Sequence, residues 1–347
     1  MGEQMPATLE SGTHSSLPFC DGFGRPLTYL RLSVTDRCNL RCVYCQSNAV
    51  KQFIPHEHIL HYEEMLRLIR ILRGLGLKKV RLTGGEPFVR KDFCAFLGML
   101  RTTFPDMDVR ITSNGTLVSS AVSFLQEVGI TALNLSLDSF DKKTFAAITG
   151  RDCLQDVLYS LDRLCEAGIP VKINAVALQG VTQASLDAFV AVAKERDLDV
   201  RFIEFMPMGQ ETVWSQARFC SVKTLFEALQ TIVPLEKCSA KDPLDGPAVM
   251  YTLSGGRGRI GFISALSDHF CGSCNRLRIT SEGALRLCLF DDREIPLRPL
   301  LRNATVHDSD IASLIQESVR QKPMGYELLA KRTGNAVARR TMSRIGG

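Results

Sequence analysis

Short apolar segments alternate with amphipathic segments along residues 29–206, and this alternation constrains the fold more than any other feature of the chain. The apolar segments have the length of strands, and they are Tyr29–Val34, Lys79–Thr83, Met107–Thr112, Ala132–Leu137, Val171–Ala175 and Val200–Phe205. The intervening segments have helical periodicity, and they are Tyr62–Leu72, Phe93–Thr103, Val118–Glu127, Leu154–Glu166 and Leu186–Arg196. Gly129 and Gly168 follow two of them, where glycine suits the left-handed residue that ends a helix. Strands that alternate with helices predict a parallel sheet with right-handed crossovers.

Polar residues recur at every second position of several predicted strands, although a parallel strand covered on both faces is normally apolar throughout. These residues are Arg31 and Ser33, Arg81 and Thr83, Asn134 and Ser136, and Lys172 and Asn174. A closed eight-stranded barrel fills its interior with aliphatic layers and would not suit a polar inner face. We therefore expect an α/β fold, a partial six-fold (βα) barrel of the TIM type with a polar lining. A one-sided sheet with a solvated face is the alternative.

The pattern changes after Met206. Short strands are predicted at Ala248–Leu253, Arg259–Ile263, Leu277–Thr280 and Ala284–Leu289, and helices at Trp214–Pro234, Ser309–Arg320 and Gly325–Arg332. Strands followed by helices predict a smaller α+β domain. We thus expect a flexible extension over residues 1–18, a barrel over 19–206 and a C-terminal domain over 207–347.

Composition and the N-terminal segment predict a reducing compartment, but they do not identify a function. The net charge of +5 mildly suits an anionic substrate, and no apolar run approaches the length of a membrane span. The first 17 residues lack the apolar core of a secretory signal, so we expect a cytoplasmic protein with no membrane or nucleic-acid partner. In that compartment the 12 cysteines are expected to be metal ligands or core residues rather than disulfides.

Three of these cysteines, Cys38, Cys42 and Cys45, have the spacing C-x3-C-x2-C. Three neighbouring thiolates can hold a cubane iron–sulfur cluster and leave its fourth iron without a protein ligand. A metal position left open is typical of a site that performs chemistry. A zinc site and a redox dithiol formed by Cys42 and Cys45 are the alternatives, and the third cysteine disfavours the dithiol.

A second triplet, Cys271, Cys274 and Cys288, predicts another metal site. A structural zinc knuckle with His269 or Cys20 as fourth ligand is a serious alternative. Arg276 and Arg278 follow on a predicted strand, where alternate residues project to the same side. Two guanidinium groups beside a metal suit phosphate recognition, which favours a nucleotide-binding site over a structural one.

The segment Thr83-Gly84-Gly85-Glu86-Pro87 lies at the carboxyl end of the second predicted strand, the end at which α/β folds bind ligands. Two glycines allow a ligand to approach the backbone closely. Glu86 precedes a proline and should be extended. An ordinary Gly-Gly turn is the alternative if the segment is taken alone.

The first triplet and this Gly-Gly-Glu-Pro segment together resemble the radical S-adenosylmethionine enzymes. In that family the open iron binds the amino and carboxylate groups of S-adenosylmethionine, and an electron from the cluster releases a 5′-deoxyadenosyl radical. The resemblance implies that Tyr44, Gly85, Ser136 and Met206 contact S-adenosylmethionine.

Within this family the chain is similar to members that carry two [4Fe–4S] clusters and convert GTP at the first step of molybdenum cofactor biosynthesis. The matching segments are Thr35–Cys45, Arg81–Pro87, Phe270–Arg278 and Gly346–Gly347, and the resemblance extends from Phe19 to the C-terminus. Gln46-Ser47 departs from the Met-Pro that often follows the first triplet.

The resemblance implies a lyase that forms (8S)-3′,8-cyclo-7,8-dihydroguanosine 5′-triphosphate. It implies GTP contacts by Arg31, Arg81, Thr112, Lys172, Arg276 and Arg278, and catalytic roles for Arg276, Arg278, Gly346 and Gly347. It also implies an electron donor such as flavodoxin or ferredoxin and a downstream pyranopterin-forming enzyme, and it permits a homodimer. The rival functions are a peptide-modifying enzyme of the same family and a non-catalytic iron–sulfur electron carrier.

Overall fold

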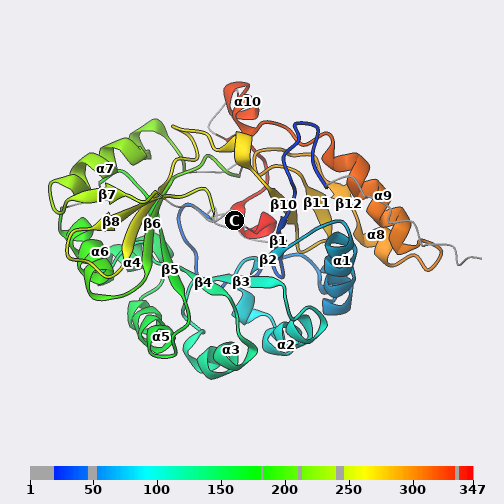
Figure 1. Ribbon diagram of the computed structural model, residues 1–347, viewed down its shortest axis with the longest axis horizontal. Helices are drawn as coiled ribbons and strands as arrows, with labels where there is room; N and C mark the ends of the chain where they lie inside the picture. Colours follow the sequence, from blue (N-terminus) through cyan, green and yellow to red (C-terminus); the bar gives the residue numbers. More distant parts are fainter. Residues whose placement is uncertain are drawn as a thin grey trace, which may run out of the picture.

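The computed structural model describes residues 19–45, 53–180, 183–209, 213–239, 246–332 and 336–346. Six parallel strands in sequence order form the middle of its sheet. They are β1 (Tyr29–Ser33), β2 (Lys79–Thr83), β3 (Asp108–Ser113), β4 (Ala132–Ser136), β5 (Val171–Ala177) and β6 (Asp199–Glu204). Figure 1 shows the strands curving around a centre with the helices outside, so the predicted partial barrel is confirmed.

The helices that follow these strands are amphipathic and cover the outer face of the sheet. They are α1 (Tyr62–Gly74), α2 (Phe93–Thr103), α3 (Val122–Val128), α4 (Lys142–Thr149), α5 (Leu154–Glu166) and α6 (Gln183–Glu195). In α5, for example, Leu154, Val157, Leu161 and Leu164 form one buried stripe at helical spacing. Gly129 and Gly168 have φ values of 69° and 68°, as the sequence predicted for residues that end helices.

The strands after residue 206 extend this same sheet at both edges. Beside β1 lies parallel β10 (Arg276–Ile279), followed by antiparallel β11 (Ala284–Arg286) and β12 (Ile295–Pro296). Beside β6 lies parallel β9 (Arg259–Ile263), followed by antiparallel β8 (Val249–Leu253) and β7 (Leu235–Lys237). The C-terminal strands thus widen the barrel, and the division of the chain at residue 206 stays a prediction.

The remaining helices are α7 (Val222–Gln230), α8 (Arg298–Leu301), α9 (Asp308–Val319), α10 (Gly325–Ala330) and α11 (Met342–Ile345). The long helix predicted over Trp214–Pro234 is wrong in its bounds. Ser221 caps α7 by accepting a hydrogen bond from the amide of Thr224, so the helix begins at Val222. None of the helices in the described ranges is long and apolar enough to span a membrane.

The two faces of the central strands differ as the sequence pattern predicted. On β2, Val80 and Leu82 belong to the apolar core under the helices, whereas Lys79, Arg81 and Thr83 line a cavity inside the barrel. The last residues that the structure describes enter this same space, where the C-terminus is marked in Figure 1. The polar interior of the barrel therefore lies next to the C-terminal end of the chain.

Candidate active site

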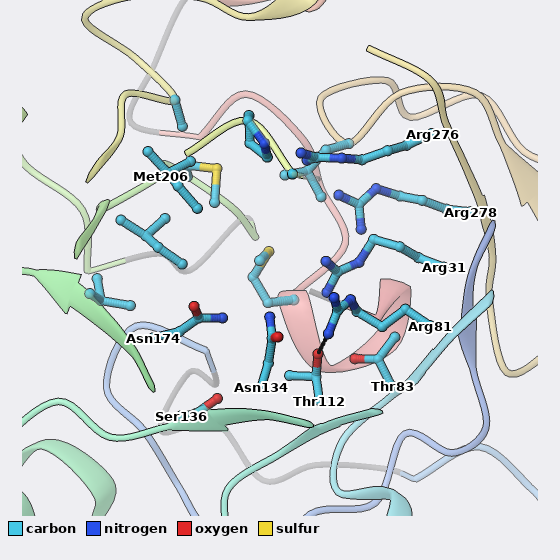
Figure 2. A pocket seen from close by; sticks show the side chains of 18 of the residues that line it. Arg31, Arg81, Thr83, Thr112, Asn134, Ser136, Asn174, Met206, Arg276 and Arg278 are labelled. Atoms are coloured by element: carbon cyan, nitrogen blue, oxygen red, sulfur yellow. Dashed lines mark hydrogen bonds between the residues drawn. The ribbon is translucent and has the colours of Figure 1, made fainter. Parts of the chain in front are cut away.

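A cavity of about 310 Å³ occupies the interior of the barrel, and both cysteine triplets line it. Most of the residues predicted to bind ligands also line it: Arg31, Tyr44, Arg81, Gly85, Thr112, Ser136, Met206, Arg276 and Arg278. In Figure 2, the guanidinium groups of Arg31, Arg81, Arg276 and Arg278 form one row on a single side of the cavity. Met206 and Asn174 face this row from the opposite side, with Ser136 and Thr112 below.

The first cysteine loop is fixed by backbone hydrogen bonds to the end of α4. The amides of Arg41 and Val43 donate to the carbonyls of Thr149 and Ile148, at 2.8 and 2.9 Å. The amide of Cys45 donates to the carbonyl of Cys42 at 3.0 Å, which closes a tight turn between these two cysteines. The chain thus holds the triplet at the mouth of the barrel without a disulfide.

Gly84 and Gly85 allow a close approach between two segments of the chain itself. The amide of Gly85 donates to the carbonyl of Thr35 at 2.7 Å, and that of Glu86 donates to the carbonyl of Arg37 at 2.8 Å. A Cβ atom at position 85 would lie 2.1 Å from the Arg37 carbonyl oxygen. Only glycine fits here, because a side chain would push away the loop after β1 that leads into Cys38.

Glu86 connects this segment to Cys38 through Asn114. Its buried carboxylate accepts hydrogen bonds from the Ser113 hydroxyl at 2.8 Å and the Asn114 amide at 2.7 Å. The side-chain nitrogen of Asn114 in turn lies 3.7 Å from Cys38 Sγ. Burial raises the pKa of Glu86 to about 7, against the effect of these hydrogen bonds. The backbone of Glu86 is extended, as its position before proline predicted.

Tyr44 is tied to the barrel wall by a short hydrogen bond to Asp138. Its hydroxyl lies 2.6 Å from Asp138 Oδ2, and Asp138 Oδ1 accepts from the amide of Val176 at 2.8 Å. Burial raises the pKa of Asp138 to about 6. Burial also raises the pKa of the Cys38 and Cys42 thiols, so their thiolate forms need a nearby positive charge or a metal.

The second triplet lies where β10 and β11 meet the end of α9. Although burial raises the pKa of Cys274, the neighbouring Lys322 and Arg276 lower it overall. Burial dominates at Cys288 and raises its pKa. Gly325 packs directly against this site, because a Cβ atom there would lie 3.1 Å from Cys288 Sγ and 3.5 Å from Cys271 Sγ.

The two triplets differ from a preformed site for a single metal ion. A tetrahedral zinc ion needs its sulfur ligands roughly 3.8 Å apart, since each Zn–S bond is about 2.3 Å. Within the described ranges, no group of three or more cysteine, histidine, aspartate or glutamate side chains could hold one metal ion. In a cubane, by contrast, each thiolate binds a different iron. The three thiols of each triplet line one cavity and can supply the ligands of an iron–sulfur cluster, and a zinc knuckle with His269 or Cys20 stays the alternative at the second triplet.

The arginine row follows from strand register. Arg31 on β1 stands directly between Arg81 on β2 and Arg278 on β10. Tyr29 precedes Arg31 by two residues and lies on the same strand face, and its hydroxyl accepts a hydrogen bond from Arg81 Nε at 2.6 Å. Although burial raises the pKa of Tyr29, Arg81 and Arg31 lower it overall, to about 6. So many converging cations create a strong preference for a polyanionic ligand.

Lys172 is the one predicted GTP contact that the described structure does not place in the cavity wall. Its ammonium lies 3.4 Å from Asp199 Oδ2. Other polar residues that do line the cavity were not assigned a role from the sequence: Tyr29, Lys79, Arg110, Asn114, Asn134, Asn174 and Arg201. Lys79 could have been found, because it precedes Arg81 by two residues and therefore shares its strand face.

The C-terminal tail reaches the arginine row. The carbonyl of Gly346 accepts hydrogen bonds from Arg31 Nε at 3.1 Å and Arg278 Nη1 at 3.0 Å. Gly346 has a left-handed φ of 69° and ends α11. Gly347, which was predicted to act with it, lies outside the described residues, as do the extension over residues 1–18 and the Gln46-Ser47 departure.

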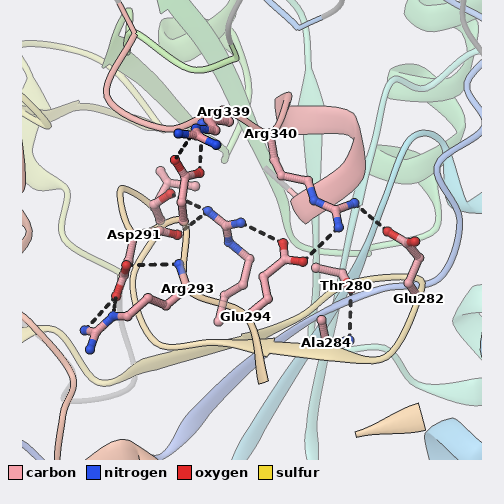
Figure 3. A network of polar contacts seen from close by, with 11 residues as sticks. Thr280, Glu282, Ala284, Asp291, Arg293, Glu294, Arg339 and Arg340 are labelled. Carbon is pink, nitrogen blue, oxygen red and sulfur yellow. Dashed lines mark hydrogen bonds and ion pairs between the residues drawn. The ribbon is translucent and has the colours of Figure 1, made fainter. Parts of the chain in front are cut away.

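An ion-pair network fixes the tail just before it enters the cavity (Figure 3). Arg340 bridges two carboxylates, with Nη1 2.5 Å from Glu282 Oε2 and Nη2 2.8 Å from Glu294 Oε2. Glu294 also pairs with the buried Arg286, at 2.8 Å. Arg286 donates to the carbonyls of Leu289 and Asp291 in the loop after Cys288. The same network thus supports both the second cysteine site and the tail.

Arg340→Ala is expected to weaken docking of the tail. Arg339→Ala is the matched control, because the Arg339 side chain is 80% exposed and its ion pair with Asp292 is long, at 3.9 Å. Loss of the ion pairs with Glu282 and Glu294 should lower the free energy of tail docking by about 1 kcal/mol. Turnover should then fall roughly fivefold, with little change in melting temperature. Steady-state rates of both variants would check this, and equal rates would contradict an anchoring role.

Two family models match consecutive parts of the chain. Residues 32–193 match the Radical SAM superfamily, and residues 198–328 match Molybdenum Cofactor Synthesis C. Among solved structures, SuiB of Streptococcus suis bound to S-adenosylmethionine has a similar fold, with a TM-score of 0.60. The match covers 90% of this chain and 76% of that chain at 15% sequence identity, so it concerns the fold alone.

Curated relatives match over nearly their whole length. The GTP 3′,8-cyclase of Desulforamulus reducens is 39% identical over 329 residues, 94% of this chain and 99% of that protein. The GTP 3′,8-cyclase of Thermodesulfovibrio yellowstonii is 37% identical, with the same coverage of both chains. The GTP 3′,8-cyclase of Listeria monocytogenes is 36% identical over 94% of this chain and 98% of that protein. The chain therefore belongs to the GTP 3′,8-cyclase family of radical S-adenosylmethionine enzymes.

Proposed function

We propose that this chain converts GTP to (8S)-3′,8-cyclo-7,8-dihydroguanosine 5′-triphosphate, the first step of molybdenum cofactor biosynthesis. One observation carries the proposal: four arginines stand in a row inside a cavity that is lined by two separate cysteine triplets. The row supplies the positive charge that a triphosphate needs. The triplets supply a place for radical generation at one side and for an auxiliary group at the other.

The arginine row would bind the triphosphate. Arg31, Arg81 and Arg278 lie side by side on three adjacent strands, so their guanidinium groups can each take a different phosphate oxygen. Because strands hold these side chains more rigidly than loops do, the ribose would be fixed relative to the cysteine loop. Thr112, within 3.5 Å of Arg81 Nη1, would help to set the position of that guanidinium.

The cysteines would hold two [4Fe–4S] clusters, with Cys38, Cys42 and Cys45 at the first and Cys271, Cys274 and Cys288 at the second. When bound, the first cluster with S-adenosylmethionine supplies the 5′-deoxyadenosyl radical, as in its family. Tyr44, Gly85, Ser136 and Met206 would hold S-adenosylmethionine, since all four line the cavity. The surrounding wall limits access of water to the reacting atoms.

The tail would complete the site. In the structure the Gly346 carbonyl occupies donors of Arg31 and Arg278, two residues of the proposed triphosphate site. Lys172 would join the site by leaving Asp199 for the substrate. An electron donor such as flavodoxin or ferredoxin, a downstream pyranopterin-forming enzyme, a homodimer and a cytoplasmic location stay predictions.

The test is anaerobic incubation of reconstituted protein with dithionite, S-adenosylmethionine and GTP. We expect 5′-deoxyadenosine and the cyclic nucleotide only when GTP is present, and neither product with ATP in its place. Formation of 5′-deoxyadenosine that is indifferent to GTP would overturn the assignment and favour another substrate, such as a peptide.

A further inference from the structure

A buried cation lies beside the second cysteine triplet in the part of the chain that the structure describes. Lys322 is 2% exposed, and its side chain lines the cavity together with Cys274 and Cys288. The buried Arg286 is paired with Glu294, and Lys79 lies 4.0 Å from Asp108. Lys322 has no such carboxylate partner within 4.0 Å among the described residues. A buried ammonium normally requires a compensating anion.

The contacts of Lys322 join the two segments that carry the cysteines. Its Nζ donates to the carbonyl of Arg276 at 2.8 Å and also to the carbonyl of Leu287. Arg276 lies two residues after Cys274, and Leu287 directly precedes Cys288. One side chain therefore fixes the distance between two of the three ligand-bearing positions.

The segment that contains Lys322 is itself fixed against the third cysteine. Arg25 donates to the Cys271 carbonyl at 2.7 Å and to the carbonyls of Lys322 and Pro323, each at 3.2 Å. Arg25 is held in turn by Asp21, at 2.6 Å, and both side chains are buried. Gly325, three residues after Lys322, has no side chain and so leaves room for the sulfur atoms of Cys288 and Cys271.

We infer that Lys322 is a positioning residue of the second cysteine site, which ties its ligand-bearing segments together and supplies the positive charge that a thiolate-bound cluster requires. The inference rests on the proposed function, in which this triplet holds an iron–sulfur cluster. The anion that the ammonium lacks is thus the cluster with its thiolates.

The charge has a second consequence, for the reduction potential of the cluster. Net charge and hydrogen bonding around a cluster set its potential. Reduction adds a negative charge, which is stabilised by a buried cation whose ammonium bonds to the carbonyls of Arg276 and Leu287, close to two ligands. Removal of the Lys322 charge should therefore make the second cluster harder to reduce, with a more negative midpoint potential.

The experiment isolates the second site in a parent chain with Cys38→Ala, Cys42→Ala and Cys45→Ala. Lys322→Met and Lys322→Arg are compared with Lys331→Met, an exposed lysine after α10. Lys322→Met should lower the apparent iron affinity by roughly 10- to 100-fold, as loss of an outer-shell partner does. The cluster that remains should titrate at a more negative potential by electron paramagnetic resonance, and Lys322→Arg should restore both readouts in part.

The possible outcomes separate this inference from the proposed function. A parent chain that binds no iron would overturn the two-cluster proposal and this inference with it. A parent that binds iron, with Lys322→Met equal to Lys331→Met in iron content and potential, would overturn the inference alone. In the chain with all its cysteines, Lys322→Met should still hold about four irons at the first triplet. Loss of iron from both sites would mean a general folding defect and would contradict a local role.

Discussion

Cys42→Ala is expected to abolish the formation of 5′-deoxyadenosine while leaving GTP binding intact. The substitution removes one of three thiols that line the cavity from the first loop, and two thiols cannot replace the full ligand set. Iron content after reconstitution should fall by about four atoms per chain. GTP should still bind, because the arginine row comes from β1, β2 and β10 rather than from this loop.

Cys94→Ala provides the matched control. Cys94 lies on α2, packs against the apolar core outside the barrel and does not line the cavity in the described structure. Its loss should cost about 1 kcal/mol of stability and leave both iron content and cleavage unchanged. A Cys42→Ala protein that keeps its iron and still cleaves S-adenosylmethionine would refute the assignment of the first triplet.

The sequence was sufficient where structure depends on local pattern. Lys79–Thr83, Phe93–Thr103 and Leu154–Glu166 were predicted with the bounds that the structure has, because their apolar spacing is regular. The helix α4 was missed, since it has eight residues and buries only Phe145 and Thr149. The strands β7 and β12, of three and two residues, are too short to have a detectable period.

What the sequence could not give is the pairing of distant segments. The addition of β10 to one edge of the barrel and β9 to the other follows from contacts between residues far apart in the chain. The membership of the candidate active site also depends on contacts between residues far apart in the chain. Cys271 and Arg278 were predicted from spacing, whereas Lys322 was missed, because only the folded chain brings the end of α9 to the cysteines.

Gly346→Ala is expected to lower GTP turnover by two orders of magnitude or more while barely changing the melting temperature. A Cβ atom at this position would lie 2.7 Å from Thr83 Cγ2 and 3.2 Å from Ser33 Cβ, so the tail must move out of the cavity. Its carbonyl would then leave Arg31 and Arg278. Stability should hardly change, since only the end of the chain after Ile345 has to move and the fully buried Ile345 stays in place.

Gly168→Ala separates the steric effect from the backbone effect. Gly168 has nearly the same left-handed conformation, with φ of 68°, but a Cβ atom there would meet nothing within 4 Å. Its replacement should therefore cost about 1 kcal/mol through backbone strain and leave turnover unchanged. Thermal melting and GTP turnover of both variants would thus show opposite patterns: Gly168→Ala loses stability and Gly346→Ala loses activity. If Gly346→Ala keeps full turnover, the tail has no part in the reaction, and its contact with the two arginines serves only to close the barrel.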